Sequence, residues 1–122
     1  MPAEPDDSPR PIAGSLEVVQ EANQLSGAAV LFEWSEAKRL DNLQKRGVDF
    51  RDAALIFSNE FMEQQDKRSD YGEERYRALG HVGKDNFVVV YTWRGKTRRI
   101  ISAWKVDEDG KRRYQNILSG NP

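Results

Sequence analysis

The spacing of apolar residues changes from a helical period to a twofold period near Asn59. Before that point, one segment repeats its apolar residues every three or four positions between Ser35 and Gly47. Ser35 suits the N-cap of a helix, and Gly47 suits the left-handed residue that ends one. We therefore predict a helix there whose apolar stripe faces the core, namely Ala37, Leu40 and Leu43. The opposite, outward stripe consists of Lys38, Asn42 and Lys45.

The segments that flank this helix are also patterned. Ser15–Leu25 has spaced apolar residues that predict a short helix, and Ala28–Trp34 reads as a strand leading into the first helix. Asp49 is placed to cap a second helix over Phe50–Phe57. Four residues of that helix share one apolar side and predict that it is buried: Phe50, Ala53, Ala54 and Phe57.

After Asn59 the twofold alternation predicts strands. Phe61–Gln65 fits a short strand, and the charged segment Asp66–Glu73 fits a loop. Three longer strands follow, separated by glycine-containing turns, and should pair as an antiparallel meander: Arg75–Val82, Phe87–Trp93 and Thr97–Trp104. Asp107–Leu118 then predicts a C-terminal helix, although Gly110 lowers its helix propensity.

The predicted architecture is α+β. Two N-terminal helices should pack on one face of an antiparallel sheet of about four strands, followed by the C-terminal helix. The run FVVVY at Phe87–Tyr91 is apolar on both faces and therefore predicts the central strand.

Composition adds bounds to this picture. The chain has 122 residues, 38% of them apolar and 32% charged, which suits one soluble domain with its own core. Residues 1–27 are acidic and proline-rich, and we expect them to form a largely disordered leader that contains a possible short helix. We expect residues 28–118 to form the folded domain and residues 119–122 to form a short tail. There is no cysteine, no basic and apolar signal segment and no membrane-length apolar run, so we expect a cytoplasmic protein.

Charge is unevenly distributed although the net charge is only −1. Residues 1–31 have a balance of −4 and residues 32–114 a balance of +3. A mildly basic body is a weak indication of a polyanionic partner.

Several chemistries are excluded by residue type and spacing. One histidine, His81, and no cysteine leave no recognisable zinc site, and no glycine-rich phosphate loop or nucleophile elbow occurs. We expect no cofactor and no metal. What remains is an excess of arginine and lysine on predicted strands and at helix ends.

Four separated motifs, in order, resemble the BrnT family of bacterial toxins over Phe32 to about Tyr114. They are FEWSEAKRLDNLQKRGVDF, RSDYGEERYRALG, VVVYT and RIISA. The resemblance implies a RelE-like fold and a ribonuclease of a type II toxin–antitoxin pair that cleaves RNA without a metal. It also implies a BrnA-like antitoxin as partner, with DNA contacted only indirectly through the antitoxin.

The resemblance also carries expectations for individual residues. The residues expected to act in catalysis are Arg75, Arg99, Ser102 and Lys45. Those expected to bind RNA are Lys38 and Asn42, carried over in the same way, together with Arg46, Arg77, Trp104 and Lys105, which the resemblance does not supply. The general base stays open between His81, a carboxylate such as Glu73 or Glu74, and a lysine.

Two departures from the family pattern bear on activity. Arg46 stands where the family usually has histidine, and Trp104 stands where it commonly has arginine. An alternative is therefore a catalytically weak or inactive BrnT-like protein that acts with its antitoxin in operon repression.

Each feature also has a structural reading without function. Lys38, Asn42 and Lys45 can be a solvated helix face, and the strand arginines can simply solvate a sheet in a generic interaction domain. By strict alternation Arg98 and Arg99 point to opposite faces, and Arg99 and Trp104 also do unless a bulge intervenes. Trp34 and Trp93 are expected to pack in the core or at an edge.

Overall fold

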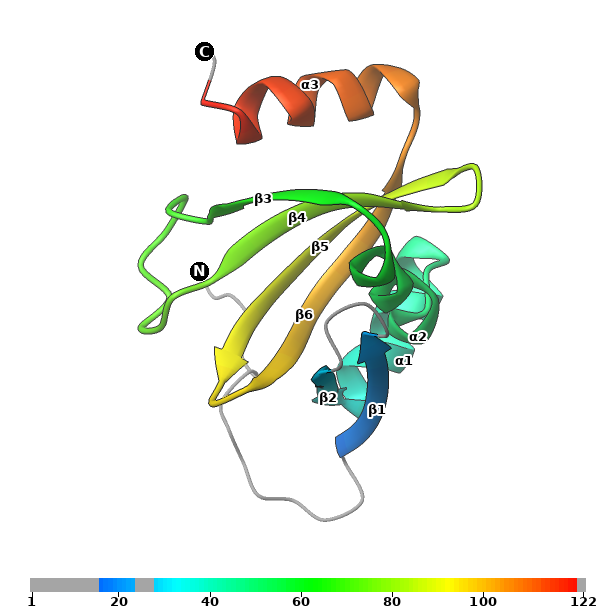
Figure 1. Ribbon diagram of the computed structural model, residues 1–122, viewed down its shortest axis with the longest axis vertical. Coiled ribbons are helices and arrows are strands. Elements are labelled where there is room, and N and C mark those ends of the chain that lie inside the picture. The colour runs from blue at the N-terminus through cyan, green and yellow to red at the C-terminus, as the bar shows by residue number, and fades with distance from the viewer. Residues whose placement is uncertain (1–15, 24–27, 121–122) are drawn as a thin grey trace.

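The computed structural model describes residues 16–23 and 28–120 and shows one twisted sheet with helices on both faces (Figure 1). The sheet has six strands in the order β1-β2-β6-β5-β4-β3. The strands are β1 (Leu16–Asn23), β2 (Ala28–Ser35), β3 (Phe61–Gln65), β4 (Tyr76–Val82), β5 (Asp85–Arg94) and β6 (Thr97–Val106). The helices are α1 (Glu36–Arg46), α2 (Phe50–Ala53) with a 3₁₀ turn over Ala54–Ser58, and α3 (Glu108–Leu118).

The predicted α+β class and the antiparallel meander of β4, β5 and β6 are confirmed. The strand count of about four is wrong, and so is the expectation of a purely antiparallel sheet. Strand β2 pairs parallel with β6 at Leu31, Phe32 and Glu33, which makes the sheet mixed. A parallel pair needs a long crossover, and the segment that connects β2 to β6 contains both predicted helices.

The helix expected over Ser15–Leu25 is also wrong where the chain is described. Leu16–Asn23 is a strand paired antiparallel with β2 along its whole length. Strand pairing with an available sheet edge outweighs a weak helical period, because strand preference depends on tertiary context. The expectation of disorder for residues 1–15 and 24–27 lies outside the described residues.

The two faces of the sheet differ in what covers them. On one, which we call the core face, α2 and the 3₁₀ turn bury a large apolar cluster that includes Phe32, Trp34, Phe50 and Tyr91. On the other, which we call the α3 face, α3 covers only a small cluster built on Leu79, Val88 and Leu118. Both clusters draw on β5, as the apolar run FVVVY predicts.

The second predicted helix is shorter than expected. Its α-helical part ends at Ala53, and Ala54–Ser58 continues as a 3₁₀ helix. Its predicted burial is confirmed, since Phe50, Ala53, Ala54 and Phe57 are at most 9% exposed. Ile56 of the 3₁₀ turn lies so close to β4 that a Cβ on Gly80 would stand 2.7 Å from the Ile56 Cβ. That close approach explains a glycine inside a strand.

Helix α1 has the predicted ends but the opposite orientation. Ser35 caps it and Gly47 ends it with a φ of 71°. Its predicted apolar stripe is exposed instead: Ala37, Leu40 and Leu43. Arg39 and Asn42 are the buried residues. The reason is polar: Arg39 pairs with Glu36 and Asp49, and Asn42 bonds backbone groups, so the buried side is selected by hydrogen bonds.

Candidate functional site

Strand β6 contains a bulge that decides which of its side chains share a face. Tyr91 of β5 is paired with Ile100, but the preceding Val90 is paired with Ser102, so Ile101 is the extra residue. One extra residue reverses the alternation beyond it. Arg99, Ser102 and Trp104 therefore all lie on the α3 face, and the bulge named as the exception to strict alternation does occur.

Strand β4 brings two further arginines to the same face. Arg77 is paired with Val90, and Leu79 is paired with Val88, which belongs to the cluster under α3. Alternation places Arg75 on that face as well. We call the group Arg75, Arg77, Thr92, Arg99 and Ser102 the arginine face. In this register Arg77 and Ser102 flank Val90 from β4 and β6, so their Cα atoms are about 10 Å apart at ordinary strand spacing.

The three arginines of the arginine face are buried and each lies beside a carboxylate. Arg75 donates to Glu73 at 3.1 Å, and Arg99 donates to Glu33 at 3.0 Å. Their exposed fractions are 5% and 3%. The side chains of Glu33 and Glu73 remain 19% and 24% exposed, so solvent reaches the carboxylates more readily than the guanidinium groups.

Arg77 has the loosest pairing. Its Nε is 3.9 Å from the Asp66 carboxylate, and its guanidinium lies 5.7 Å from the ring centroid of Tyr114 on α3. The Nε atoms of Arg77 and Arg99 are buried without any hydrogen-bond partner among the described residues. Buried donors are normally satisfied, so two guanidinium groups on one face each keep one donor that no described residue satisfies. The only other such atoms in the described chain belong to Trp34 and Arg98.

The loop between β3 and β4 folds against this face through Asp66, whose side chain is fully buried. Arg68 donates twice to its carboxylate at 2.7 Å, and the Tyr71 hydroxyl donates at 3.3 Å. Burial alone would raise the pKa of the Asp66 carboxyl, but the hydrogen bonds from Arg68 and the charges of Arg68 and Arg77 hold it below its ordinary value of 3.8. Asp66 is therefore a buried anion that fixes the loop.

The loop also covers Arg75 directly. The ring of Tyr71 lies 4.3 Å from the Arg75 guanidinium, close enough for a cation–π contact. Beside it, a cavity of about 420 Å³ is lined by Gln64, Gln65, Lys67, Arg68 and Arg77. Three of these five side chains are cationic, so the opening that leads to Arg77 attracts anions.

The remaining predicted residues are spread around α1 and the end of β6. Arg46 is exposed at the end of α1 and places its guanidinium 5.0 Å from the Trp104 ring, which brings both beside the α3 face. Lys45 is exposed and pairs with Asp41, while Lys38 is half-buried. Lys105 is also exposed and pairs with Asp85 at 3.2 Å.

Asn42 is the clearest exception to the predicted arrangement, because its side chain faces inward. It donates to the carbonyls of Val48 and Ala103 at 2.9 Å and accepts from the Ala103 amide at 3.3 Å. Both amide hydrogens are used and the residue is only 6% exposed, so Asn42 positions α1 against β6.

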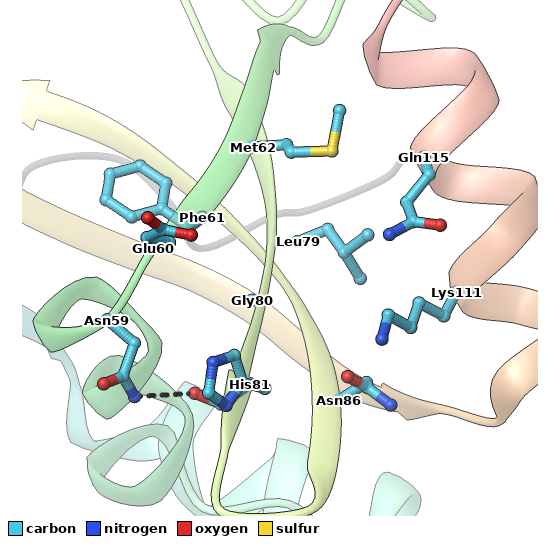
Figure 2. A pocket seen from close by; sticks show the side chains of 10 residues that line it. All are labelled: Asn59, Glu60, Phe61, Met62, Leu79, Gly80, His81, Asn86, Lys111 and Gln115. Atoms are coloured by element: carbon cyan, nitrogen blue, oxygen red, sulfur yellow. Dashed lines mark hydrogen bonds between the residues drawn. The ribbon is translucent and has the colours of Figure 1, made fainter.

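A second, larger cavity lies at the opposite end of the α3 face. It measures about 660 Å³ and lies between α3 and strands β3 and β4, with Met62 and Leu79 facing Lys111 and Gln115 of α3 (Figure 2). His81 lines it and lies 3.2 Å, through Nδ1, from the carbonyl of Gly83. His81 shares the face with the arginines but stands four residues beyond Arg77, under the other end of the sheet. This separates the one histidine from the arginine face.

Sequence reasoning missed three residues of this site: Glu33, Asp66 and Thr92. Thr92 donates to the Glu74 carbonyl at 2.6 Å and fixes the chain just before Arg75. Glu33 could be placed only by the unexpected parallel pairing of β2 with β6. Asp66 had a signal, since it begins the charged loop DKRSDYGE, but nothing in the sequence marks that carboxylate as buried.

Comparison with known proteins identifies one family. The family model described as ribonuclease toxin, BrnT, of type II toxin–antitoxin system matches residues 34–109, which is more than half of the chain. The matched span contains every residue of the arginine face. No curated protein matches the chain. None of the helices in residues 16–23 and 28–120 is long and apolar enough to cross a membrane.

Proposed function

The chain belongs to the BrnT family of ribonuclease toxins of type II toxin–antitoxin systems, and we propose that it is an endoribonuclease that cleaves RNA on the arginine face. The observation that carries this proposal is the convergence of Arg75, Arg77 and Arg99 on one side of the sheet. Two of them retain buried, unsatisfied Nε donors. Phosphate oxygens are the natural acceptors for guanidinium groups, which are planar, permanently charged and able to bind in a bidentate manner.

The chemistry that suits such a face needs no metal. The 2′-oxygen of one nucleotide attacks the adjacent phosphorus as the bond from phosphorus to the 5′-oxygen breaks. A base removes the 2′-hydroxyl proton and an acid protonates the leaving 5′-oxygen, so the products are a 2′,3′-cyclic phosphate and a 5′-hydroxyl. The arginines stabilise the extra negative charge that develops at phosphorus in the transition state. Such electrostatic stabilisation by preorganised donors is usually the largest single contribution to the rate enhancement.

Two carboxylates beside the arginine face are candidates for proton transfer. Glu33 and Glu73 are partly exposed carboxylates on the same guanidinium groups that would hold the phosphate. We assign the base to one of them, because His81 is at the other end of the α3 face. A positioned acid or base contributes about 10²–10⁴-fold. Ser102, half-buried between the arginine strands, is placed to hydrogen-bond the substrate.

The other residues expected at the site take flanking roles in this proposal. Arg46 and Trp104, in contact with each other, extend the face toward α1. Lys38, Lys45 and Lys105 are left as outer electrostatic contacts for the RNA backbone. Asn42 is withdrawn from RNA binding and acts as a scaffold residue.

The test is RNA cleavage by the purified full chain, freed of its partner, in the presence of a metal chelator. Arg75→Ala and Arg99→Ala should each reduce cleavage at least 100-fold, because removing one such donor typically costs that much. Arg99→Lys, which keeps the ion pair with Glu33, separates lost chemistry from lost folding. Arg112→Ala on the exposed surface of α3 is the matched control and should cleave normally.

Loss of cleavage in Arg112→Ala, or full activity in both Arg75→Ala and Arg99→Ala, contradicts the proposal. So does intact RNA after incubation with the wild-type chain, both alone and with ribosomes. Circular dichroism and thermal unfolding of each variant show whether the fold is retained.

We further propose that a BrnA-like antitoxin neutralises the chain in the cytoplasm by covering the arginine face, and that DNA is contacted only through that antitoxin. An acidic antitoxin segment would complement the cations around the cavity beside Arg77. Arg77→Ala should then weaken the complex, measured by calorimetry, whereas Arg112→Ala should not.

One observation favours a second candidate. Every arginine of the arginine face already lies within 4.0 Å of a carboxylate, so a phosphate must displace or share that partner. A chain in which it cannot do so is a binding protein with little catalysis that acts with its antitoxin in operon repression. Normal growth of cells that express the chain without antitoxin supports this candidate, and arrested growth supports the ribonuclease.

A further inference from the structure

Trp93 is a large aromatic residue whose side chain is partly exposed to solvent. It lies near the end of β5 and is 40% exposed, while the other aromatic residues of β5, Phe87 and Tyr91, are buried. An indole near a turn can be exposed without any function, or it can form part of a contact surface. What surrounds Trp93 decides between the two.

Two side chains of the protein contact the Trp93 indole. The Arg98 guanidinium lies over the ring at 4.6 Å from its centroid, and the Tyr91 ring meets it edge-on at 5.7 Å. Arg98 is only 8% exposed. One face of the indole is therefore covered by a buried cation, and the exposed area belongs to the opposite face.

Arg98 itself is fixed by aromatic rings. Its guanidinium also lies over Phe57 at 4.0 Å, over Tyr91 at 4.8 Å and over Phe61 at 5.5 Å. The Tyr91 hydroxyl donates in turn to Glu63. A cation held inside four rings cannot turn away, so the indole above it is a preorganised platform.

The platform adjoins a cavity that leads to the arginine face. The cavity measures about 280 Å³ and is lined by Glu73, Glu74, Tyr76, Thr92, Trp93 and Arg94. Glu73 joins the two regions, since its carboxylate accepts from Arg75 at 3.1 Å and from Arg94 at 3.2 Å. Trp93 lies with Tyr91 and Arg98 on the core-face side of β5, whereas Arg75 lies on the α3 face, so Glu73 and this cavity connect the two faces at this end of the sheet.

We propose that Trp93 is the stacking platform for one unpaired nucleobase of the RNA substrate, with Glu74 and Arg94 at the edge of that base. The inference rests on the proposed ribonuclease function and adds a specificity-determining residue to it. Aromatic stacking accepts any base, while carboxylate and guanidinium groups read the hydrogen-bonding edge. The combination of one flat apolar surface with charged edge groups suits a base better than a protein side chain.

Binding of a short single-stranded 2′-O-methyl oligoribonucleotide to the full chain tests this, because that RNA lacks the 2′-hydroxyl nucleophile and cannot be cleaved. Trp93→Leu should weaken binding about tenfold, since base–aromatic stacking is a strong contribution. Trp93→Phe should retain most of the affinity. Leu55→Ala, at another exposed apolar residue, is the matched control and should bind as the wild type.

A second arm moves one abasic position along the oligonucleotide. At one position the missing base should weaken wild-type binding about tenfold and should not weaken binding by Trp93→Leu any further. Such non-additivity shows that the base and the indole contact each other. Equal losses in the two proteins at every position overturn the inference.

The inference and the proposed function fail in different ways. RNA binding that depends on Trp93 without any cleavage contradicts the ribonuclease and leaves the platform standing. Cleavage with unchanged binding in Trp93→Leu contradicts the platform alone. A Trp93→Leu variant that binds RNA normally but loses its antitoxin assigns the indole to the protein partner and also overturns the inference.

Discussion

Asp66 shows how a single buried residue determines the shape of the arginine face. Its carboxylate collects Arg68, Tyr71 and, more loosely, Arg77. A buried carboxylate is stable only when its partners replace the water it has lost. The ion cluster around Asp66 is therefore one of the main contacts that hold the loop from β3 to β4.

Asp66→Asn should lower the free energy of unfolding by about 3 kcal/mol at pH 7, because it removes the buried anion that pairs with Arg68 and lies beside the buried Arg77. Urea denaturation of the wild type and the variant measures the loss. Asp70→Asn, on the exposed part of the same loop, is the control and should change stability little. A loss below about 0.5 kcal/mol in Asp66→Asn would mean that the cluster contributes nothing net.

The same residue predicts a pH dependence. The pKa of the Asp66 carboxyl is lower in the folded chain than its ordinary value of 3.8. Its stabilisation is therefore complete above pH 3.8 and is lost as the pH falls through the lower, folded value. The stability difference between the wild type and Asp66→Asn should be constant from pH 5 to 7 and shrink below pH 4. A difference that stays constant down to pH 2 contradicts this.

For single residues, the sequence predicted which side chains share a face of the sheet only where the simple twofold alternation applies. Arg77 on the α3 face, and Arg98 opposite Arg99, follow from the twofold period. The shared face of Arg99 and Trp104 depends on a bulge at Ile101, and no turn residue or glycine in TRRIISAW marks it. Bulges are set by the packing of neighbouring strands, which a single sequence does not show.

Helix α1 is joined to strand β6 by the side-chain hydrogen bonds of Asn42. Strand β2 pairs with β6 only at Thr97, Arg98 and Arg99, so the edge of β6 beyond them has no strand neighbour on that side. The Asn42 amide continues the ladder by bonding both the amide and the carbonyl of Ala103. A side-chain amide thus substitutes for a strand and holds α1 beside the bulged part of β6.

Asn42→Ala should lower the free energy of unfolding by about 2–3 kcal/mol, because it leaves buried backbone groups of Val48 and Ala103 unsatisfied. It should also reduce RNA cleavage through displacement of β6, while Gln44→Ala on the exposed side of α1 changes neither quantity. Thermal unfolding and the cleavage assay are the two measurements. Normal stability with lost cleavage would instead return Asn42 to the RNA-binding residues.

The orientation of α1 could not be predicted from its apolar stripe. Leu40 and Leu43 are 51% and 39% exposed, while the polar residues Arg39 and Asn42 are buried. Amphipathic analysis assumes that burial follows hydrophobicity. Here the helix lies along a strand edge, and an edge offers unpaired backbone groups, so hydrogen-bonding side chains take the inward positions.

On the scale of the whole molecule, the two faces of the sheet differ in the side chains that they carry. The core face buries most of the aromatic side chains, and the α3 face carries three of the buried arginines. The change from helical to twofold period predicted this α+β layout. It could not predict the parallel pairing of β2, because the pairing partner lies more than sixty residues along the chain.

The net charge of −1 gives the molecule little long-range attraction for RNA. Affinity must then come from direct phosphate contacts, and the dependence of binding on salt counts them. For a single strand the logarithm of the binding constant falls with the logarithm of salt concentration by about 0.7 per neutralised phosphate. If the three arginines of the arginine face each hold one phosphate, the slope for the non-cleavable oligonucleotide should be about −2.

Single substitutions then separate the charged contacts from the stacking contact. Arg77→Ala and Arg99→Ala should each reduce the magnitude of the slope by about 0.7. Trp93→Leu should lower the affinity equally at every salt concentration, because stacking releases no counterions. Arg112→Ala should leave both slope and affinity unchanged. Slopes that stay the same in the Arg77 and Arg99 variants would show that carboxylates keep these guanidinium groups from the RNA, as the binding-only candidate requires.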